Sequence, residues 1–232
     1  MRILTISDTH GDFQAFHPNK LPKVDLILIA GDLTNHGCNA PARWQARALT
    51  ELAEARVWLQ EISLQCCPQI LWIQGNHDKG MPDEFLDPFA KNIRDKTLML
   101  THEGIQLSVR GVSMTVAFDK PHLAKEWAFT TIDPSEDTAV FDFGPHNIIV
   151  SHGPPYGCLD RTNTGLHIGS PALRANILEH QPALVVCGHV HEAAGVEKIG
   201  KTLVVNSAGR ARIVVLNEVE KEVGHKKSLR NE

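Results

Sequence analysis

A chain of 232 residues is long enough to bury a sizeable core, and we expect it to fold as one domain. Its formal net charge of −4 gives no electrostatic reason to expect nucleic acid or an anionic membrane as the main partner. The five cysteines are odd in number and show no CxxC spacing, so we expect neither a disulfide framework nor a thiolate zinc site.

The first predicted strand, from Ile3 to Ile6, begins almost at the initiator Met and leaves no room for a signal peptide. No stretch of the sequence approaches the roughly 18 to 20 apolar residues that a membrane helix needs. The cysteine usage fits a reducing compartment. We therefore expect a soluble cytoplasmic protein.

Short runs of β-branched residues and leucine predict strands along the whole chain. Several are apolar without alternation, as expected of strands covered on both faces. These runs lie at 3–6, 24–30, 70–73, 147–150, 183–187 and 203–205. Three alternating segments, at 105–109, 112–116 and 212–219, are typical of strands with one wetter face. The pattern predicts two sheets.

The clearest predicted helix opens near Asn39, with Pro41 in its first turn. Its apolar residues recur at every third or fourth position, so they form one stripe that should pack on a sheet. The stripe consists of Trp44, Ala48, Leu52, Ala55, Leu59 and Ile62.

A second helix is predicted to start after Ser170 as N-cap, with Pro171 at its first position, to bury Leu173 and Ile177, and to end before Pro182. Both helices lie between strands, as crossover helices do.

The stretch 81–96 contains two prolines and is predicted to be helical in pieces. The polar, basic segment 225–232 is predicted to be a frayed tail, which leaves 1–224 as the single domain.

Five short polar clusters each follow a predicted strand and carry side chains that can bind a metal. In chain order they are Ser7-Asp8-Thr9-His10, Gly31-Asp32, Gly75-Asn76-His77-Asp78, Ser151-His152-Gly153 and Gly188-His189-Val190-His191. Carboxylates and imidazoles gathered at strand ends make a binuclear metal site the first hypothesis.

The clusters differ in how strongly each one alone indicates a metal. Asp8 and His10 are two residues apart on an extended segment, so their side chains point to one side, yet such a pair also fits a loop capping contact. The third cluster fits an Asx turn as well, although Gly75 would permit a sharp turn there. His189 and His191 both follow a buried strand. A histidine that is buried and hydrogen-bonded in the core, without a metal, would account for only one of the two.

Taken together, the clusters resemble the signature of calcineurin-like metallophosphoesterases, which is D-x-H, G-D, G-N-H-D/E, H and G-H-x-H. The resemblance covers most of the chain. It implies an α/β fold of two mixed β-sheets packed as a sandwich with flanking helices, a four-layer αββα arrangement with two metals at the strand ends. The implied ligands are Asp8, His10, Asp32 and His191 for the first metal, and Asp32, Asn76, His152 and His189 for the second, with Asp32 as the bridge.

Histidine and carboxylate ligands suit Mn, Fe, Zn, Co or Ni. Two such ions about 3.5 to 4 Å apart can share a hydroxide and stabilise phosphoryl oxygens during an in-line displacement. By the same resemblance His77 is not a ligand but a catalytic donor to a phosphoryl or leaving-group oxygen, and Asp78 holds its tautomer. A simple turn residue is the alternative for Asp78.

A narrower resemblance lies in Ser151-His152-Gly153-Pro154-Pro155-Tyr156-Gly157, with Leu159 and Asp160, and in the segment 169–173. These segments are similar to the branch that includes bacterial class III cyclic-nucleotide phosphodiesterases and brain metallophosphoesterase-domain proteins. We therefore expect hydrolysis of a phosphodiester, including a cyclic nucleotide, or of a phosphomonoester of modest size. Long nucleic acid is not expected, because no basic stripe with interleaved aromatic residues is present.

The loop from Gly153 to Ser170 leaves directly from His152 and carries Tyr156, Arg161 and His167. We predict that these three side chains bind the substrate, with solvated loop residues as the alternative. Two other functions stay open at this point, a phosphoprotein phosphatase and a non-catalytic scaffold of the same fold. A scaffold is marked by a degenerate ligand set, whereas every motif position is intact here.

Overall fold

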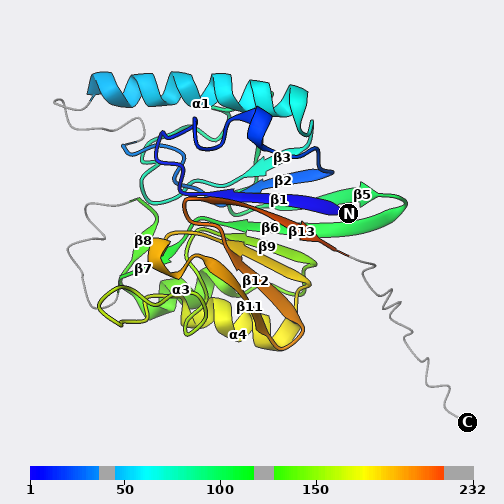
Figure 1. Cartoon of the computed structure of the whole chain (residues 1–232). Helices are drawn as coiled ribbons and strands as arrows, with labels where there is room; N and C mark the ends of the chain where they lie inside the picture. Colours follow the sequence, from blue (N-terminus) through cyan, green and yellow to red (C-terminus); the bar gives the residue numbers. More distant parts are fainter. Residues whose placement is uncertain (37–44, 118–127, 217–232) are drawn as a thin grey trace, which may run out of the picture.

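The computed structural model describes residues 1–36, 45–117 and 128–216. Its layers follow one another as helix, sheet, sheet and helices (Figure 1). The helices are α1 (Gln45–Gln65) on one side and α3 (Pro134–Phe141) with α4 (Pro171–His180) on the other. This is the four-layer arrangement expected from the sequence. Within the described ranges, no helix has the length and apolar character needed to cross a membrane.

The first sheet contains β1 (Arg2–Ser7), β2 (Leu26–Ile29), β3 (Ile70–Trp72), β4 (Lys91–Asn92) and β13 (Arg210–Val215), in the order β13-β1-β2-β3-β4. Neighbours from β1 to β4 run parallel, and β13 pairs antiparallel with β1. The carboxyl ends of β1, β2 and β3 therefore lie at one edge of this sheet.

The second sheet has the order β11-β12-β10-β9-β6-β5. Its strands are β5 (Thr97–His102), β6 (Ile105–Val112), β9 (Ile148–Ser151), β10 (Leu184–Cys187), β11 (Gly195–Ile199) and β12 (Thr202–Asn206). The four inner strands run parallel, and the edge strands β5 and β11 are antiparallel to their neighbours. The described residues also contain a short strand pair, β7 (Thr115–Val116) with β8 (Thr130–Thr131), and the 3-10 helices η1 (Pro18–Lys20) and η3 (His191–Ala193).

Both faces of the first sheet are buried along its inner strands β1, β2 and β3. On β2, Ile27 and Ile29 pack in the core beneath α1, whereas Leu26 and Leu28 pack in the core between the two sheets. A third core separates the second sheet from α3 and α4. The apolar runs without alternation thus correspond to strands covered on both faces, as predicted.

The stripe predicted for the first helix is confirmed for the part that the structure describes, because Ala48, Leu52, Ala55, Leu59 and Ile62 are all buried on α1. Its predicted start at Asn39 and Pro41, and Trp44, lie outside the described residues, as does the tail 225–232.

The second helix is confirmed in detail. The hydroxyl of Ser170 accepts a hydrogen bond from the amide of Leu173, Pro171 is the first residue of α4, and the helix ends at His180.

Two expectations about local structure are wrong. The stretch 81–96 forms turns and then β4, because its prolines interrupt helical hydrogen bonding and Lys91 and Asn92 pair with β3. The segment 112–116 is not one strand either. Val112 ends β6, and only Thr115 and Val116 form β7.

Candidate metal centre

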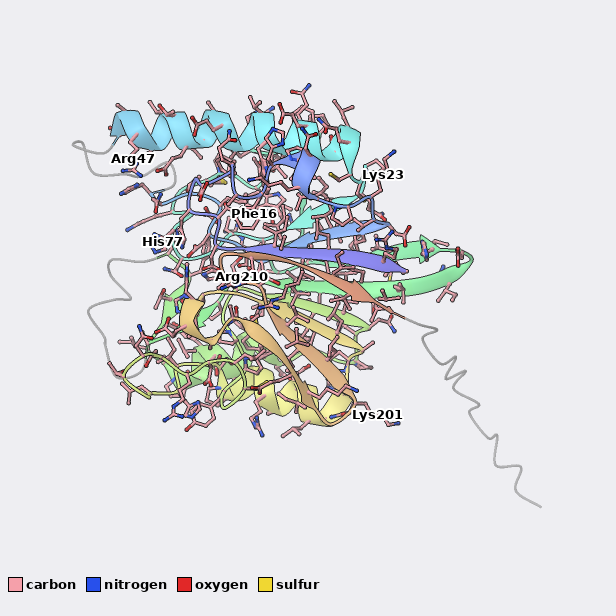
Figure 2. All side chains as sticks on the ribbon, in the orientation of Figure 1. Phe16, Lys23, Arg47, His77, Lys201 and Arg210 are labelled. Atoms are coloured by element: carbon pink, nitrogen blue, oxygen red, sulfur yellow. The ribbon has the colours of Figure 1, made fainter. Side chains whose placement is uncertain are left out.

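The predicted ligand clusters follow the carboxyl ends of β1, β2, β3, β9 and β10. Because these strands end at the same side of the sandwich, the five clusters converge there. Figure 2 labels His77 at this side and Lys23, which precedes β2, at the opposite side. Three sets of side chains have potential ligand atoms within 4.8 Å of one another: Asp8 with His10 and His191, Asp8 with Asp32 and His152, and His10 with Asp32 and His77.

One half of the centre is built around Asp8. His191 Nε2 lies 3.3 Å and His10 Nε2 lies 3.8 Å from Asp8 Oδ1, and the two Nε2 atoms are 3.3 Å apart. The carboxylate is buried, and the amide of His189 donates to both of its oxygens at 3.1 and 2.9 Å. We call Asp8, His10 and His191 the open half, because both rings are partly exposed.

The other half is built around Asn76. Its Oδ1 atom lies 2.8 Å from His152 Nε2 and 3.0 Å from His189 Nδ1. We call Asn76, His152 and His189 the deep half, since His152 and Asn76 are buried, although His189 is partly exposed.

Asp32 lies between the two halves. Its Oδ2 is 3.3 Å from His152 Nε2 and 3.9 Å from His10 Nε2. One carboxylate oxygen is thus close to an imidazole of each half.

His152 shows that this arrangement suits a cation. Its Nδ1 lies 2.7 Å from the carbonyl oxygen of Ala30, and a carbonyl can only accept, so Nδ1 carries a proton. Its Nε2 faces oxygens of Asn76 and Asp32, which only accept, so a positive group is favoured at that position. Either a proton on Nε2 or a metal ion between these atoms meets this requirement. Imidazole, carboxylate and amide oxygen are donors that first-row divalent metals accept.

The electrostatics keep the two carboxylates ionised. Burial by itself raises the pKa of Asp8, but the hydrogen bond with His191 and the charge of His152 outweigh it and lower that pKa. Burial also acts to raise the pKa of Asp32, yet the charge and hydrogen bond of His152 hold it well below its usual range. Both groups are therefore charged at neutral pH, as metal ligands must be.

The two imidazoles of the deep half differ in charge. Burial acts to lower the pKa of His152, but the charge of Asp32 and a hydrogen bond with it raise that pKa to about 9. Burial and the charge of His152 lower the pKa of His189 to about 4. Without a metal ion, His152 is thus an imidazolium at neutral pH and His189 is neutral, and an ion bound at His152 Nε2 would take the place of its proton.

Four of the predicted ligands have strained backbones. Positive φ values occur at Asp8 (55°), His10 (46°), Asp32 (53°) and His189 (68°). Non-glycine residues seldom adopt this conformation, and it persists where the surrounding structure imposes it, often at functional sites. The convergence of the ligands therefore costs backbone free energy.

Two glycines make room for the carboxylates. A Cβ on Gly75 would lie 2.2 Å from Asp32 Oδ1, and one on Gly188 would lie 2.1 Å from Asp8 Oδ2. We expected Gly75 to permit a sharp turn, but its φ is not in the left-handed range. Close approach of a carboxylate is what requires glycine there.

His77 lies beside the centre. Its ring is edge-on to that of His10, with 4.8 Å between centroids, and its amide donates to Asp32 Oδ1 at 2.8 Å. Its Nδ1 lies 2.9 Å from the carbonyl oxygen of Asn35.

The expectation that Asp78 holds the ring of His77 needs correction. The buried Asp78 carboxylate instead accepts backbone hydrogen bonds from Gly75 at 2.9 Å, Thr34 at 3.1 Å and Leu33 at 3.3 Å. It joins the loop after β2 to the loop after β3, while the Asn35 carbonyl faces the imidazole. Burial and the charge of Asp32 raise the pKa of Asp78 to about 7 against these hydrogen bonds.

The predicted substrate residues form a separate group in the loop after His152. His167 Nδ1 lies 2.6 Å from Asp160 Oδ1, and the rings of His167 and Tyr156 are 5.7 Å apart. Arg161 pairs with His167 through a backbone bridge. The loop reaches the segment of His191 through Asn163, whose amide donates to Glu192 Oε1 at 2.8 Å.

Two further residues of the centre were not predicted. Asn35 contacts both His10 and His77, and Glu51 of α1 contacts Asn35. Glu51 could have been noticed in the sequence as the acidic residue on the apolar stripe of the helix, one position before Leu52.

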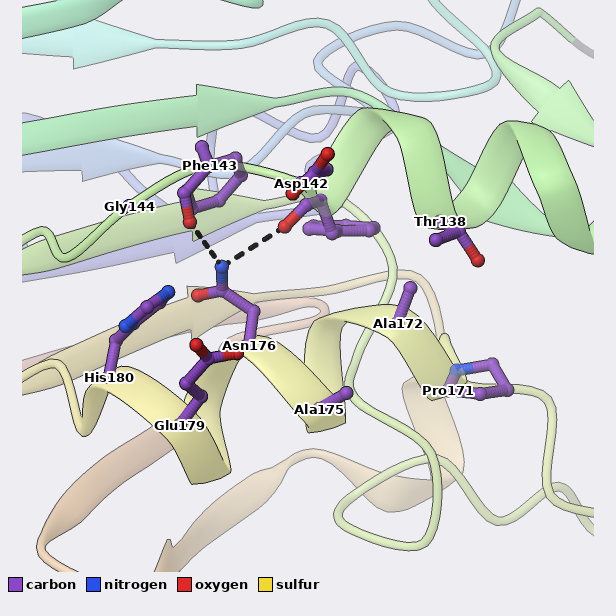
Figure 3. Close-up of a pocket in the computed structure, with 11 residues that line it drawn as sticks. Thr138, Asp142, Phe143, Gly144, Pro171, Ala172, Ala175, Asn176, Glu179 and His180 are labelled. Carbon is purple, nitrogen blue, oxygen red and sulfur yellow. Dashed lines mark hydrogen bonds between the residues drawn. The ribbon is translucent and has the colours of Figure 1, made fainter.

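A cavity of about 540 Å³ lies between α3 and α4 (Figure 3). Asn176 crosses this cavity and donates to the carbonyl oxygens of Phe141 and Phe143 at 3.0 and 2.8 Å. None of the predicted site residues lines it. The cavity therefore does not belong to the candidate centre.

With this geometry described, the chain can be compared with known proteins. A family model described as calcineurin-like phosphoesterase matches residues 1–193. The chain is 26% identical over 219 residues to an uncharacterized protein of Methanocaldococcus jannaschii, a match that covers 92% of this chain and 91% of that protein. It is 25% identical over 230 residues to metallophosphoesterase domain-containing protein 1 of Homo sapiens, with 89% of this chain and 65% of that protein covered.

Solved structures share the fold. One crystal structure superposes with a TM-score of 0.62 at 17% identity and covers 92% of this chain and 94% of its own. The protein TT1561 of Thermus thermophilus superposes with a TM-score of 0.51 at 17% identity, covering 89% of this chain and 88% of its own. At such low identity these likenesses concern the fold alone.

Proposed function

Because this chain belongs to the calcineurin-like phosphoesterase family, we propose that it is a hydrolase of phosphate esters that works with two metal ions. The observation that carries the proposal is the position of Asp32, whose Oδ2 is close to His10 of the open half and to His152 of the deep half. A carboxylate in that place can serve two ions at once.

The donor set divides naturally between two ions. Asp8, His10 and His191 with Asp32 would hold one, and Asn76, His152 and His189 with Asp32 would hold the other. Bound ions would supply Lewis acidity and a more acidic water as nucleophile. Asn76 contributes a neutral oxygen, which limits the negative charge that an incoming phosphate ester meets. Mn, Fe, Zn, Co and Ni all fit these ligands.

We assign the donor role to His77. The Asn35 carbonyl accepts from Nδ1, so the neutral ring carries its proton on Nδ1 and can take up a second proton on Nε2. A protonated His77 could stabilise a phosphoryl oxygen or give the Nε2 proton to the leaving oxygen. Asp78 supports this indirectly, because it fixes the turn that presents His77.

The substrate that we propose is a phosphodiester, including a cyclic nucleotide, or a phosphomonoester of modest size. This follows from the similarity of the segment after His152 to the phosphodiesterase branch, and from a net charge of −4 that does not favour a polyanion. Tyr156, Arg161 and His167 are the side chains that we propose select among such esters.

A hydrolysis screen tests the proposal. Purified protein is treated with a chelator, Mn²⁺ is added back, and phosphomonoesters, linear diesters and 2′,3′- and 3′,5′-cyclic nucleotides are assayed. We expect activity on at least one ester class that disappears with the chelator and returns with Mn²⁺. Hydrolysis of none of them, together with substoichiometric metal in the purified protein, would instead support a scaffold of this fold.

A further inference from the structure

Glu51 is an acidic residue on the buried face of α1, and only 5% of its surface is exposed. The other buried residues of α1 are apolar, which is what packing against a sheet requires. Burying a carboxylate is unfavourable unless several hydrogen bonds compensate for the lost water. The hydrogen-bond partners of Glu51 therefore indicate the role of this buried carboxylate.

Within the described residues, three hydrogen bonds converge on this carboxylate, and His36 Nδ1 lies 3.9 Å from its Oε2. The amide N–H of Asn35 donates to Oε2 at 2.9 Å, the Asn35 side chain donates to Oε1 at 3.0 Å, and Arg47 Nε donates to Oε1 at 3.1 Å. Gly11 packs against the stem of Glu51, since a Cβ there would lie 3.1 Å from its Cγ. Two of these bonds fix Asn35 in one orientation.

Asn35 in turn contacts two histidines of the centre. Its side-chain amide donates to the carbonyl oxygen of His10 at 2.5 Å, and its own carbonyl oxygen lies 2.9 Å from His77 Nδ1. One residue held by Glu51 thus supports the backbone of a predicted ligand and the ring of the predicted donor. A ring nitrogen of His77 lies within 4.8 Å of potential ligand atoms of His10 and Asp32.

Helix attachment alone does not explain this carboxylate. An apolar side chain at position 51 would attach α1 to the sheet without burying a charge, as Leu52, Ala55 and Leu59 do. Among the described residues, its polar contacts are with the loop residues Asn35 and His36 and with an Arg47 side chain that is 62% exposed. The carboxylate is therefore directed at the loop after β2.

We propose that Glu51 is a positioning residue of the hydrolytic site, which acts through Asn35 to keep the proton of the neutral His77 ring on Nδ1 and to direct Nε2 toward the reacting group. The inference rests on the proposed function. It adds a residue from the outer helix layer to the site, and it makes the Asn35 carbonyl the group that selects the tautomer.

A double-mutant cycle tests the route through His77. Glu51→Gln keeps the shape of the side chain but removes the charge and one of its two acceptor oxygens. We expect kcat for an alkyl phosphate ester to fall about 10 to 100-fold, as is typical when the partner of a site residue is lost. In a His77→Ala background the same substitution should lower kcat much less, because only the contact of Asn35 with the His10 carbonyl is then left to disturb.

Glu54→Gln is the matched control, since Glu54 is an exposed acid on the same helix. It should leave kcat and the melting temperature unchanged. Equal losses from Glu51→Gln in both backgrounds, or no loss in either, would overturn the proposal. Asn35→Ala is the second variant in case Glu51→Gln folds poorly. It leaves Glu51 unchanged but removes the Asn35 side chain that donates to Glu51 Oε1. We expect its loss to depend on His77 in the same way.

Nitrogen NMR of the histidine rings reports the tautomer of His77 directly and does not depend on enzyme activity. In the wild-type protein and in Glu54→Gln, His77 should show the Nδ1–H tautomer, and in Glu51→Gln a mixture of tautomers. An unchanged His77 spectrum in folded Glu51→Gln contradicts the inference, whether or not the enzyme is active. Failure of the wild-type protein to hydrolyse any ester contradicts the proposed function instead, so the two failures are distinct.

Discussion

The two halves of the candidate centre differ in their access to solvent. In the open half, the side chains of His10 and His191 are 23% and 49% exposed, whereas the side chain of His152 in the deep half is 0% exposed. Both halves contain two histidines and share Asp32, but the open half adds the Asp8 carboxylate and the deep half the Asn76 amide. His189 of the deep half is itself partly exposed, so the difference in access lies mainly at His152.

The origin of the difference is topological. His152 directly follows β9, an inner strand of the second sheet, and its ring reaches the carbonyl of Ala30 at the end of the first sheet. His10 and His191 lie farther along their loops, each two residues beyond the first predicted ligand of its cluster, Asp8 or His189. We infer that an ion in the deep half would be held by ligands that the protein fixes, and that an ion in the open half would exchange and meet the substrate.

Asp32→Ala should have the largest effect, because it removes the carboxylate that both halves share. We expect turnover to be lost and the occupancy of both ions to fall, as measured by metal analysis of the purified variant. Asp12→Ala, which removes an exposed carboxylate from the loop of His10, should keep both metals and activity. If Asp32→Ala retained two ions per chain, the bridging role would have to be abandoned.

Removing one ligand from each half should show that the two halves differ in how readily they take up an ion again. His152→Ala should lose one ion that added Mn²⁺ does not restore, because a buried site that has lost its imidazole has no ready replacement. His191→Ala should also bind one ion weakly, yet excess Mn²⁺ should recover part of the activity, since water can replace an exposed ligand. Titrating Mn²⁺ into both chelated variants measures the difference. Identical titrations would show that exposure does not distinguish the halves.

His77→Ala should affect chemistry rather than metal content. We expect both ions and the fold to be kept while kcat falls roughly 10² to 10⁴-fold, as is typical for loss of a general acid. The loss should be smaller for p-nitrophenolate, which leaves without a proton, than for an alkoxide.

Kinetics with the two ester types and metal analysis distinguish the roles of His77. A missing ion would make His77 a ligand, a role compatible with its proximity to His10 and Asp32. An equal loss for both leaving groups would favour phosphate binding over proton donation.

The residue pattern predicted two sheets, because apolar runs without alternation are typical of strands covered on both faces. The four layers and the gathering of the clusters at the strand ends were implied by the family resemblance. The hairpin strand β5 was missed, although Gly104 marks its turn: Glu103 and Gly104 both have positive φ, as a type I′ hairpin turn requires.

Side-chain partners could not be predicted in the same way. Asp78 was expected to face His77, which is its neighbour in sequence, but its oxygens bond to backbone amides that include those of Leu33 and Thr34. Such contacts depend on how two loops from different strands meet, and the spacing within one motif contains no information on that.

The loop after His152 should show the smallest effect, because it lies beside the centre and supplies no predicted ligand. Tyr156 is 45% exposed, and His167 is held against Asp160, which is itself only 1% exposed. Replacing Tyr156, Arg161 or His167 with alanine should leave metal content unchanged and shift the ratio of kcat/KM between a cyclic nucleotide and p-nitrophenyl phosphate. The ratio is expected to shift about tenfold, which corresponds to the loss of one contact that contributes about 1.4 kcal/mol. Leu178→Ala, at an exposed position of α4, is the control and should not shift the ratio. If all three loop variants kept the wild-type ratio across several esters, substrate selection would have to be sought in the open half, where His191 is the most exposed of its predicted ligands.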